Sequence, residues 1–317
     1  MTLPTLGLVG LGKIARDQHI PAIAATGLFQ LAAVVSPDGG AADGVPAFRS
    51  QAEMLAALPG LDAVALCTPP AVRHGLTVEA LRAGKHVLIE KPPAATLSEL
   101  HDLVAEAEAA RRTLFTAWHS QFNPAVEETR RRLANIISND AAIRSVAITW
   151  KEDVRRWHPG QDWIFAAGGF GVFDPGINAL SILTDILPAP VFVGAADLHV
   201  PANRDTPIAA TLEMRAAPGS RIGRVTADFD FLQQGEQTWA IVIESDGGRL
   251  DLTHGGTRLA VDGVPVLAEP DTEYQRIYRH FHRLMGDGAS DVDARPLSLV
   301  ADACMVGRWH RTDAFDW

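Results

Sequence analysis

Short apolar runs alternate with longer helix-like segments over the first third of the chain. One such segment spaces Leu100, Leu103 and Ala107 three and four residues apart, which places them on one face of a helix. A repeated order of apolar run and helix is typical of βαβ units on a doubly wound parallel sheet. The runs that predict strands are 6–9, 31–35, 63–66, 86–89 and 114–116, and the helices between them include 72–83 and 97–110.

The pattern changes after about residue 120. Val146, Ile148 and Trp150 alternate with more polar residues, as in a half-buried strand. Most segments beyond residue 191 have strand character, which predicts an α+β domain with a large, mostly antiparallel open sheet. We therefore expect an α/β protein with domains at 1–120 and 121–317, a division that suits 317 residues. The other elements predicted here are helices at 124–133, 175–187, 273–285 and 297–311, and strands at 143–150, 208–214, 225–231, 239–244, 249–252 and 259–261.

Composition excludes several classes of partner. The formal net charge is −10 and no stripe of lysine and arginine stands out, so a nucleic-acid partner is not expected. The two cysteines, Cys67 and Cys304, give neither a disulfide framework nor metal-ligand spacing. No apolar stretch approaches the roughly 18–20 residues of a membrane helix, and the N-terminus lacks a leader pattern. We expect a cytoplasmic protein with no membrane partner and no metal.

A glycine-rich turn follows the first predicted strand. Residues 10–15 read Gly-Leu-Gly-Lys-Ile-Ala, with Gly10 and Gly12 at the turn and Ala15 in the following helix. In a Rossmann fold the first glycine permits the tight turn, the second lets the backbone approach a pyrophosphate, and the small third residue allows close helix packing. Such a turn can be purely structural, but its place between a strand and a helix favours a dinucleotide cofactor, NAD or NADP.

The end of the second predicted strand bears on the choice between these cofactors. A carboxylate there would bind the ribose hydroxyls of NAD, whereas an arginine would suit the phosphate of NADP. The sequence places Ser36 and Asp38 at this point. Asp38 therefore favours NAD, although Pro-Asp-Gly is also a good turn sequence in its own right.

Two further clusters follow the third and fourth predicted strands, at the edge where doubly wound sheets bind ligands. Cys67-Thr-Pro-Pro70 would turn the chain under the cofactor, and Glu90-Lys91-Pro92 would present a lysine toward it. The prolines could equally mark loops and Lys91 could be a solvated cation, but the position at a strand end favours a role in the site. The expected cofactor contacts are Gly10, Gly12, Lys13, Ile14, Ser36, Asp38, Cys67, Thr68, Pro69, Pro70, His74, Glu90 and Lys91.

A segment rich in aromatic and acidic residues precedes the helix predicted at 175–187. Carbohydrates are held by carboxylates and amides that bond paired hydroxyls and by aromatic faces against the ring, and this segment offers both. It could also be a charged surface loop or serve a subunit contact. Its candidate residues are Trp150, Glu152, Asp153, Trp157, His158 and Trp163.

Asp174 and Asn178 follow this segment with a spacing of four, which places them on one face near the start of the helix. Asp174 before Pro175 is also an excellent pair for the N-cap and first position of that helix. We favour ligand contact for both Asp174 and Asn178, with the capping role left open.

Gly10-x-Gly12, Glu90-Lys91-Pro92 and the sheet-rich second half resemble the Gfo/Idh/MocA oxidoreductase family over nearly the whole chain. The resemblance implies that Lys91 lies beside the nicotinamide and the substrate hydroxyl, as proton acceptor or electrostatic aid. The family's second signature is an aspartate followed four residues later by histidine, whereas here Asn178 follows Asp174. A neutral amide cannot act as a general base, so the proton would go to Lys91, Asp174 or a water between them.

Trp118-His119-Ser120 and the segment from Trp150 to Ser181 closely resemble the branch of bacterial L-arabinose and D-galactose 1-dehydrogenases, which also carries asparagine at this position. His119 alone would more often be a satisfied strand-end histidine, so its role depends on this likeness. The expected catalytic residues are Lys91, Asp174 and Asn178, and the expected sugar contacts are His119, Glu152, Asp153, Trp157, His158 and Trp163.

The expected reaction is oxidation of the anomeric carbon of L-arabinose or D-galactose to the aldonolactone, with reduction of NAD or NADP. Two alternatives stay open: a dehydrogenase of another sugar or polyol such as an inositol, and an NAD(P)-binding sensor without turnover. The resemblance also implies a homodimer or homotetramer, since both occur in the family.

Overall fold

The computed structural model describes residues 2–42 and 44–317 of the chain. Contacts divide the chain into two compact units. The first comprises Met1–His119 with Glu273–Ala294, and the second comprises Ser120–Thr272 with Arg295–Trp317. The predicted boundary at residue 120 assigns the helix at 273–285 to the second domain, whereas in the structure this helix belongs to the first unit. The first unit is therefore assembled from two separate stretches of the chain.

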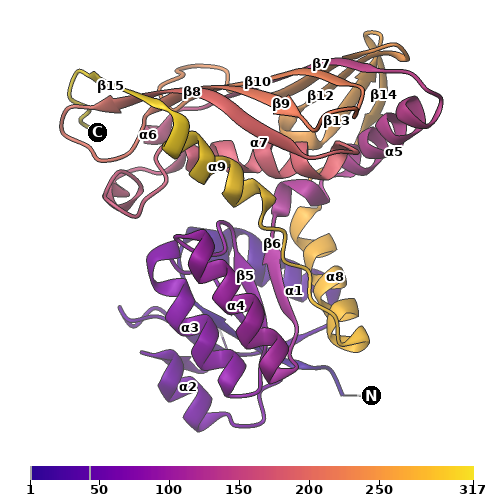
Figure 1. Cartoon of the computed structure of the whole chain (residues 1–317). Coiled ribbons are helices and arrows are strands. Elements are labelled where there is room, and N and C mark those ends of the chain that lie inside the picture. Colours follow the sequence, from indigo (N-terminus) through magenta and orange to yellow (C-terminus); the bar gives the residue numbers. More distant parts are fainter. Residues whose placement is uncertain (1, 43) are drawn as a thin grey trace. The chain divides into compact units, whose positions relative to one another are not determined.

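The first unit contains a parallel sheet with the strand order β3-β2-β1-β4-β5-β6 (Figure 1). Its central strands are apolar and buried along most of their length, because helices cover both faces. This is the order of a Rossmann fold, which the alternating pattern predicted. The strands are β1 (Thr5–Val9), β2 (Gln30–Val35), β3 (Ala47–Phe48), β4 (Ala63–Leu66), β5 (His86–Glu90) and β6 (Leu114–Ala117).

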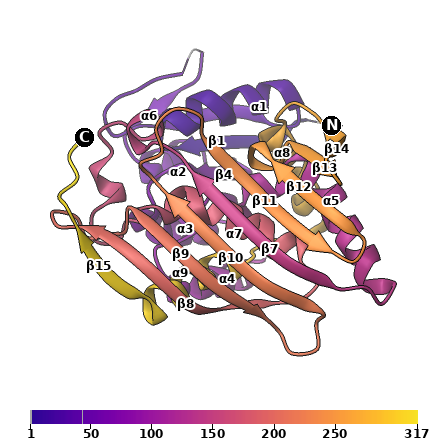
Figure 2. The same cartoon turned by 90° about the horizontal axis from the view of Figure 1, so that it is seen from above.

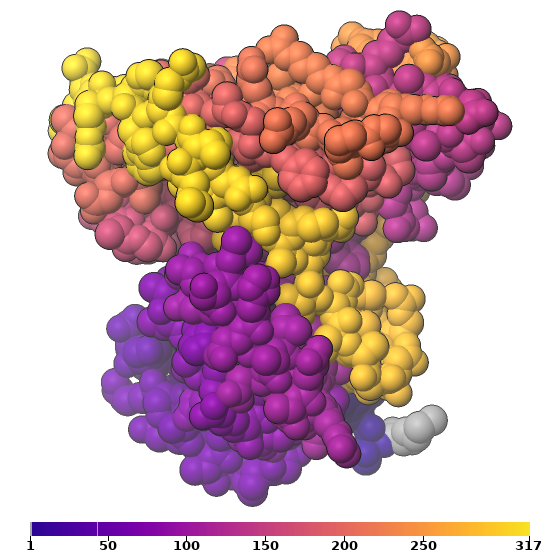
Figure 3. Space-filling model, viewed as in Figure 1, coloured from indigo at the N-terminus to yellow at the C-terminus, as the bar shows by residue number. Residues whose placement is uncertain are grey.

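The helices of the first unit form two layers. In one layer α3 contacts both α2 and α4, and in the other α1 contacts α8. The rings of Phe29 and Phe281 stack with centroids 5.7 Å apart, and Figure 3 shows the gold surface of α8 against the purple surface of the first unit. The helices are α1 (Ile20–Thr26), which continues a π-helical turn at Ala15–His19, α2 (Gln51–Ala57), α3 (Pro70–Arg82), α4 (Leu97–Ala110) and α8 (Glu273–Asp287).

The second unit contains a large open sheet with the strand order β14-β13-β12-β11-β7-β10-β9-β8-β15 (Figure 2). Neighbouring strands are antiparallel except for β7 with β10 and β8 with β15, which run parallel. The mostly antiparallel sheet predicted from the sequence is thus confirmed. The strands are β7 (Ile143–Lys151), β8 (Val191–Pro201), β9 (Ala209–Ala216), β10 (Ile222–Asp230), β11 (Thr238–Ser245), β12 (Gly248–Thr253), β13 (Arg258–Val261), β14 (Val264–Ala268) and β15 (Arg308–Thr312).

Helices cover one face of this sheet: α5 contacts β12, α7 contacts β7, and α9 contacts β8. Val146, Ile148 and Trp150 of β7 are buried, whereas Lys151 on the same strand forms an ion pair with Asp228 at 2.5 Å. Within the described residues, no helix is both long and apolar enough to cross a membrane. The helices are α5 (Pro124–Ser138), α6 (Val154–Trp157), α7 (Phe173–Ile186) and α9 (Arg295–Val306), with 3₁₀ turns at His119–Phe122, Asp162–Ile164 and His254–Gly256.

The helix predicted at 297–311 is wrong in its second part. α9 ends at Val306, and the residues after Gly307 form β15, parallel to β8. A Cβ on Gly307 would lie 2.5 Å from the Ala303 carbonyl oxygen, so only glycine allows the chain to leave the helix in this direction. Strands β3, β8 and β14 were not predicted individually.

Candidate active site

The glycine turn connects β1 to the helical turn that starts the first crossover. Gly10 has φ of +92°, and a Cβ there would lie 2.9 Å from the carbonyl carbon of Cys67. Only glycine fits this position without strain. At Gly12, by contrast, nothing lies within 4 Å of the place that a Cβ would occupy. The backbone at Gly12 is therefore open to close approach by a phosphate group.

A buried hydroxyl beside this turn supplies a second test of the cofactor site. Thr68 Oγ1 is buried and has no hydrogen-bond partner among the described residues. Its methyl carbon would lie 3.1 Å from a Cβ on Gly10, so the hydroxyl belongs to the same corner of the sheet. Buried polar atoms normally have a partner, and an orphan therefore needs an explanation. An open glycine backbone beside an unpartnered hydroxyl fits a bound dinucleotide.

The end of β2 forms a turn. The N–H of Gly39 donates to the Ser36 carbonyl at 3.0 Å, and the N–H of Gly40 donates to Ser36 Oγ at 3.1 Å. Ser36 is buried, while Asp38 is exposed. Arg49 borders the same turn, with its guanidinium donating to the Pro37 carbonyl at 3.2 Å. The turn role considered for Asp38 is thus present, and its exposed carboxylate stays available to a ribose.

Two of the predicted cofactor contacts have partners within the protein. Lys13 forms an ion pair with Asp17 one turn later, on an exposed surface. His74 Nε2 lies 2.7 Å from a carboxylate oxygen of Asp102, which joins α3 to α4. Of the other predicted contacts, Cys67 and Pro70 are buried, Ile14 is half-buried, and Pro69 is exposed.

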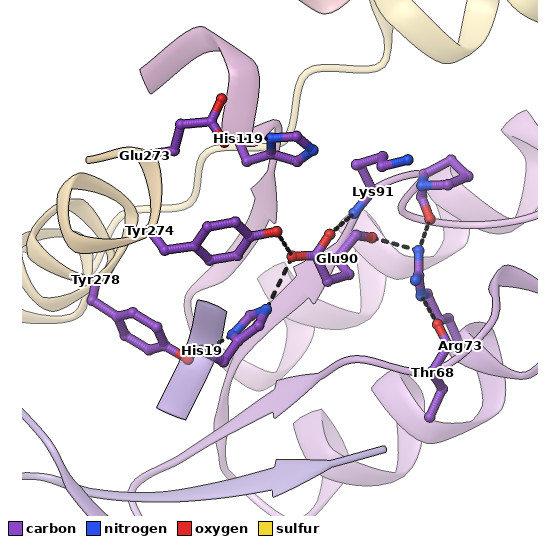
Figure 4. A network of polar contacts seen from close by, with 10 residues as sticks. His19, Thr68, Arg73, Glu90, Lys91, His119, Glu273, Tyr274 and Tyr278 are labelled. Atoms are coloured by element: carbon purple, nitrogen blue, oxygen red, sulfur yellow. Dashed lines mark hydrogen bonds and ion pairs between the residues drawn. The ribbon is translucent and has the colours of Figure 1, made fainter. Parts of the chain in front are cut away.

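The Glu90-Lys91-Pro92 turn at the end of β5 is held from both sides (Figure 4). Glu90 Oε2 accepts the backbone N–H of Lys91 at 2.9 Å. Arg73 of α3 donates to the carbonyl oxygens of Glu90, at 2.6 Å, and of Pro92, and its Nε donates to the Thr68 carbonyl at 2.6 Å. Arg73 is only 5% exposed, so this guanidinium is committed to the backbone of the two strand ends.

The second oxygen of the Glu90 carboxylate is also occupied. Glu90 Oε1 accepts the hydroxyl of Tyr274 at 2.7 Å and lies 3.0 Å from His19 Nε2, while His19 Nδ1 lies 2.7 Å from the hydroxyl of Tyr278. Burial alone would raise the pKa of Glu90, but the hydrogen bond and charge of His19, with the Tyr274 hydroxyl, lower it to about 2. Burial would lower the pKa of His19, but Cys67, Tyr278 and Glu90 raise it well above its ordinary value. Glu90 is therefore an ionised, fully bonded carboxylate inside the first unit.

His119 lies in the same unit beside this network. Its Nδ1 lies 2.8 Å from Glu273 Oε2, and its ring stacks on Tyr274 with centroids 5.7 Å apart. Burial lowers the pKa of His119, but the Glu273 carboxylate raises it further, so the net direction is upward. A positively charged or hydrogen-bonding imidazole is thus available at this position.

The other predicted residues lie in the second unit. α7 begins at Phe173 with Val172 as its N-cap, which places Asp174 inside the first turn. The capping role considered for Asp174 is therefore wrong. Its carboxylate is 4% exposed and lies 3.5 Å from His158 Nε2. Asn178 follows one turn later, half-buried, and its side-chain amide has no hydrogen-bond partner among the described residues.

Glu152 and Asp153 lie between β7 and α6 and have different surroundings. Glu152 is 6% exposed, and its Oε2 accepts the indole N–H of Trp239 at 2.9 Å. Asp153 is the N-cap of α6, because its carboxylate accepts the N–H of Arg155 at 3.0 Å. Trp157 packs edge-on against Trp239 with centroids 5.5 Å apart. Trp163 is half-buried in the 3₁₀ turn at Asp162–Ile164.

Several partners of the site residues were not predicted. His19 and Tyr278 are 259 positions apart, and no local pattern relates them. One signal was present: the two tyrosines of the chain, Tyr274 and Tyr278, lie four residues apart on the apolar face of a helix. Buried tyrosine hydroxyls need partners, which indicates a polar network beneath that helix.

The sequence model of the Gfo/Idh/MocA family, described as an oxidoreductase family with an NAD-binding Rossmann fold, matches residues 5–118. The galactose 1-dehydrogenase of Pseudomonas fluorescens is 46% identical over 310 residues, which cover 98% of this chain and 98% of that protein. The chain belongs to the Gfo/Idh/MocA oxidoreductase family.

Two solved structures share this fold. A D-galactose-1-dehydrogenase from Rhizobium etli has a TM-score of 0.93 and 49% identity, covering 100% of this chain and 99% of that one. A 3-ketoreductase from Actinomadura kijaniata, solved with TDP-benzene and NADP, shares the fold at a TM-score of 0.80 and 20% identity, covering 98% and 100%. Membership of the Gfo/Idh/MocA family confirms the predicted resemblance and the cofactor class, NAD or NADP. The roles of individual side chains stay predictions.

Among the described residues, no three histidine, cysteine or acidic side chains gather in a group that could hold a metal ion. The side chains predicted for the site are a lysine, a buried aspartate, carboxylates, imidazoles and an amide, and they come from both units. These groups bind hydroxyls and move protons.

Proposed function

We propose that this chain is an NAD(P)-dependent aldose 1-dehydrogenase that oxidises the anomeric carbon of D-galactose, of L-arabinose, or of both. The observation that carries the proposal is the 46% identity with the galactose 1-dehydrogenase of Pseudomonas fluorescens over 98% of both chains. The Rhizobium etli D-galactose-1-dehydrogenase supports it at 49% identity. The side chains of the candidate site supply the groups that this oxidation needs.

The chemistry divides between cofactor and protein. When bound, the nicotinamide accepts a hydride from C1 of the sugar. The protein then has to remove the proton of the anomeric hydroxyl and stabilise the negative charge that develops on its oxygen. We assign these two tasks to Asp174 and Lys91. The cationic ammonium of Lys91 would stabilise negative charge that develops on the oxygen, and the buried carboxylate of Asp174 would accept the proton. Asn178 would orient a hydroxyl, because a neutral amide cannot take up a proton.

Sugar recognition is assigned to the aromatic and acidic segment and to His119. The indole of Trp239 donates to Glu152 and so fixes the direction of its carboxylate. D-Galactose and L-arabinose share the configuration of their ring hydroxyls and differ by one hydroxymethyl group. Contacts to the ring hydroxyls therefore serve both sugars, and a difference of this size is worth only about 1–3 kcal/mol in discrimination.

The product and the preferred cofactor follow from the same assignment. Oxidation at C1 of the ring form leaves the ring oxygen bonded to the new carbonyl carbon, so the immediate product is an aldonolactone. We assign a preference for NAD, because the exposed carboxylate of Asp38 follows the end of β2, where it would repel the 2′-phosphate of NADP. Arg49 borders the same turn and acts in the opposite direction, so the preference should be modest.

The test is reduction of NAD and of NADP by the purified protein with a panel of aldoses and polyols, followed by absorbance of the reduced nicotinamide. D-Galactose and L-arabinose should reduce the cofactor faster than D-glucose or myo-inositol, and hydroxylamine should trap the lactone as a hydroxamate. Reduction by polyols alone would replace the aldose assignment. Cofactor binding without reduction by any sugar would favour a sensor.

A further inference from the structure

Helix α8 supplies three closely spaced polar side chains to the first unit (Figure 4). Each one reaches a different segment: the 3₁₀ turn after β6, the end of β5, and the π-helical turn after the glycine motif. All three residues are buried on one face of this amphipathic helix, and the other buried residues of that face are apolar. The pairs are Glu273 with His119 at 2.8 Å, Tyr274 with Glu90 at 2.7 Å, and Tyr278 with His19 at 2.7 Å.

We propose that α8 is a positioning element for Lys91, and that it acts through the hydroxyl of Tyr274. This rests on the role that the proposed function gives to Lys91. The Glu90 carboxylate makes the connection, because one oxygen accepts the Tyr274 hydroxyl while the other accepts the backbone N–H of Lys91. Two hydrogen bonds, joined by the Glu90 carboxylate, thus connect the Tyr274 hydroxyl to the backbone N–H of Lys91.

The burial of Glu90 makes this connection stiff. Its side chain is 4% exposed, so water cannot replace a lost donor without entering the unit. Without the Tyr274 hydroxyl, Oε1 keeps only His19, and the carboxylate can rotate toward other donors at the cost of its bond to Lys91 N–H. A misplacement of a reacting group by about 1 Å can cost on the order of 10²-fold in rate.

Arg73 defines the other side of the same turn. It binds the carbonyl oxygens on either side of Lys91, those of Glu90 and Pro92, and so limits how far the backbone can follow a displaced carboxylate. The lysine backbone is therefore held between a guanidinium from α3 and a carboxylate that depends on α8. Loss of one hydroxyl should move the turn partially and not release it.

A purely structural role for α8 makes a different prediction. The helix also packs through apolar side chains such as Ile277 and Phe281, so any buried substitution on it can lower stability. A matched control is Thr113→Val, because Thr113 is 2% exposed and its hydroxyl donates to the Leu284 carbonyl of α8 without touching Glu90. Tyr274→Phe and Thr113→Val each remove one buried hydroxyl: that of Tyr274 belongs to α8, and that of Thr113 contacts α8.

The kinetic test compares Tyr274→Phe, Tyr278→Phe and Thr113→Val with the wild type. Tyr274→Phe should lower kcat about tenfold, equivalent to about 1.4 kcal/mol of activation free energy. Its Kd for NAD, measured by quenching of tryptophan fluorescence, should stay unchanged. Tyr278→Phe, one bond further from Lys91, should have a smaller effect on kcat, and Thr113→Val should lower only the melting temperature. Equal kcat in Tyr274→Phe and Thr113→Val would overturn the proposal.

A second readout does not depend on turnover. The chain has four lysines, Lys13, Lys85, Lys91 and Lys151, so reductive methylation with carbon-13 gives few signals, which Lys→Arg variants can assign. In Tyr274→Phe the Lys91 signal should shift while those of Lys13 and Lys151 stay in place. If the wild type oxidises no aldose, the proposed function fails, but this spectrum still tests the positioning role. An unmoved Lys91 signal would overturn it.

Discussion

Replacing Glu90 with glutamine measures how much the buried carboxylate stabilises the first unit. The pKa of Glu90 is about 2 against an ordinary 4.5: burial raises it, but the hydrogen bond and charge of His19, together with the Tyr274 hydroxyl, lower it by more. The difference of about 2.5 units, at about 1.4 kcal/mol per unit, corresponds to about 3 kcal/mol. Glutamine keeps the shape of the side chain and removes its charge, so it isolates this contribution.

The pH dependence gives the prediction its sign. Because the pKa is lowered in the folded state, the stabilisation is present above pH 4.5 and is lost as the pH falls toward 2. Near neutral pH, the free energy of unfolding of Glu90→Gln should therefore be about 3 kcal/mol lower than that of the wild type. The difference between the two proteins should shrink as the pH falls from 4.5 toward 2.

The assay is urea unfolding followed by tryptophan fluorescence at a series of pH values, with linear extrapolation to water. Glu108→Gln is a suitable control, because Glu108 is exposed on α4. Its stability difference from the wild type should be near zero at every pH. A stability difference for Glu90→Gln that does not change across the acid range would refute the reasoning. A Glu90→Gln variant as stable as the wild type near neutral pH would refute it as well.

Four further substitutions test the site. Lys91→Ala should lower kcat by about 10²–10³-fold and leave the Kd for NAD nearly intact; unchanged kcat would remove Lys91 from the mechanism. Asp174→Ala should abolish aldose oxidation with little change in Tm, whereas preserved activity with a lower Tm would indicate a structural role. Gly10→Ala forces a Cβ to 2.9 Å from the Cys67 carbonyl carbon at φ +92°, so it should lower Tm. Gly12→Ala, where the Cβ meets open space, should weaken NAD binding in a titration at unchanged Tm; equal NAD affinity would place the pyrophosphate elsewhere.

The strands of the Rossmann sheet were predictable because they are more hydrophobic than the segments that flank them in the sequence. Ala63–Leu66, for example, is a short apolar run that is buried along its whole length, flanked by polar turns. Local hydrophobicity alone therefore locates the strand. The segment at 308–312 carries no such signal, because its residues are mostly exposed at a sheet edge, and the helix before it continues the apolar spacing up to Gly307.

The partners inside the candidate site could not be predicted in the same way. Glu90 was recognised from its motif, but His19 lies 71 positions away and Tyr274 lies 184 positions away. Such pairs are decided by how α8 packs onto the first unit, which depends on contacts such as that of Phe29 with Phe281. The sequence indicates that α8 is amphipathic but does not indicate which surface receives it.

The return of α8 to the first unit has a consequence for biosynthesis. The N-terminal stretch up to His119 leaves the ribosome with Phe29 and the Glu90 carboxylate still lacking the aromatic and hydroxyl partners that α8 supplies. Domains usually fold in order as they emerge, but this one has to wait for more than 150 further residues before it is complete. A nascent chain whose synthesis stops within the strands of the second sheet would expose a nucleotide-binding unit that lacks α8. Such an incomplete unit is a natural target for chaperones and proteases.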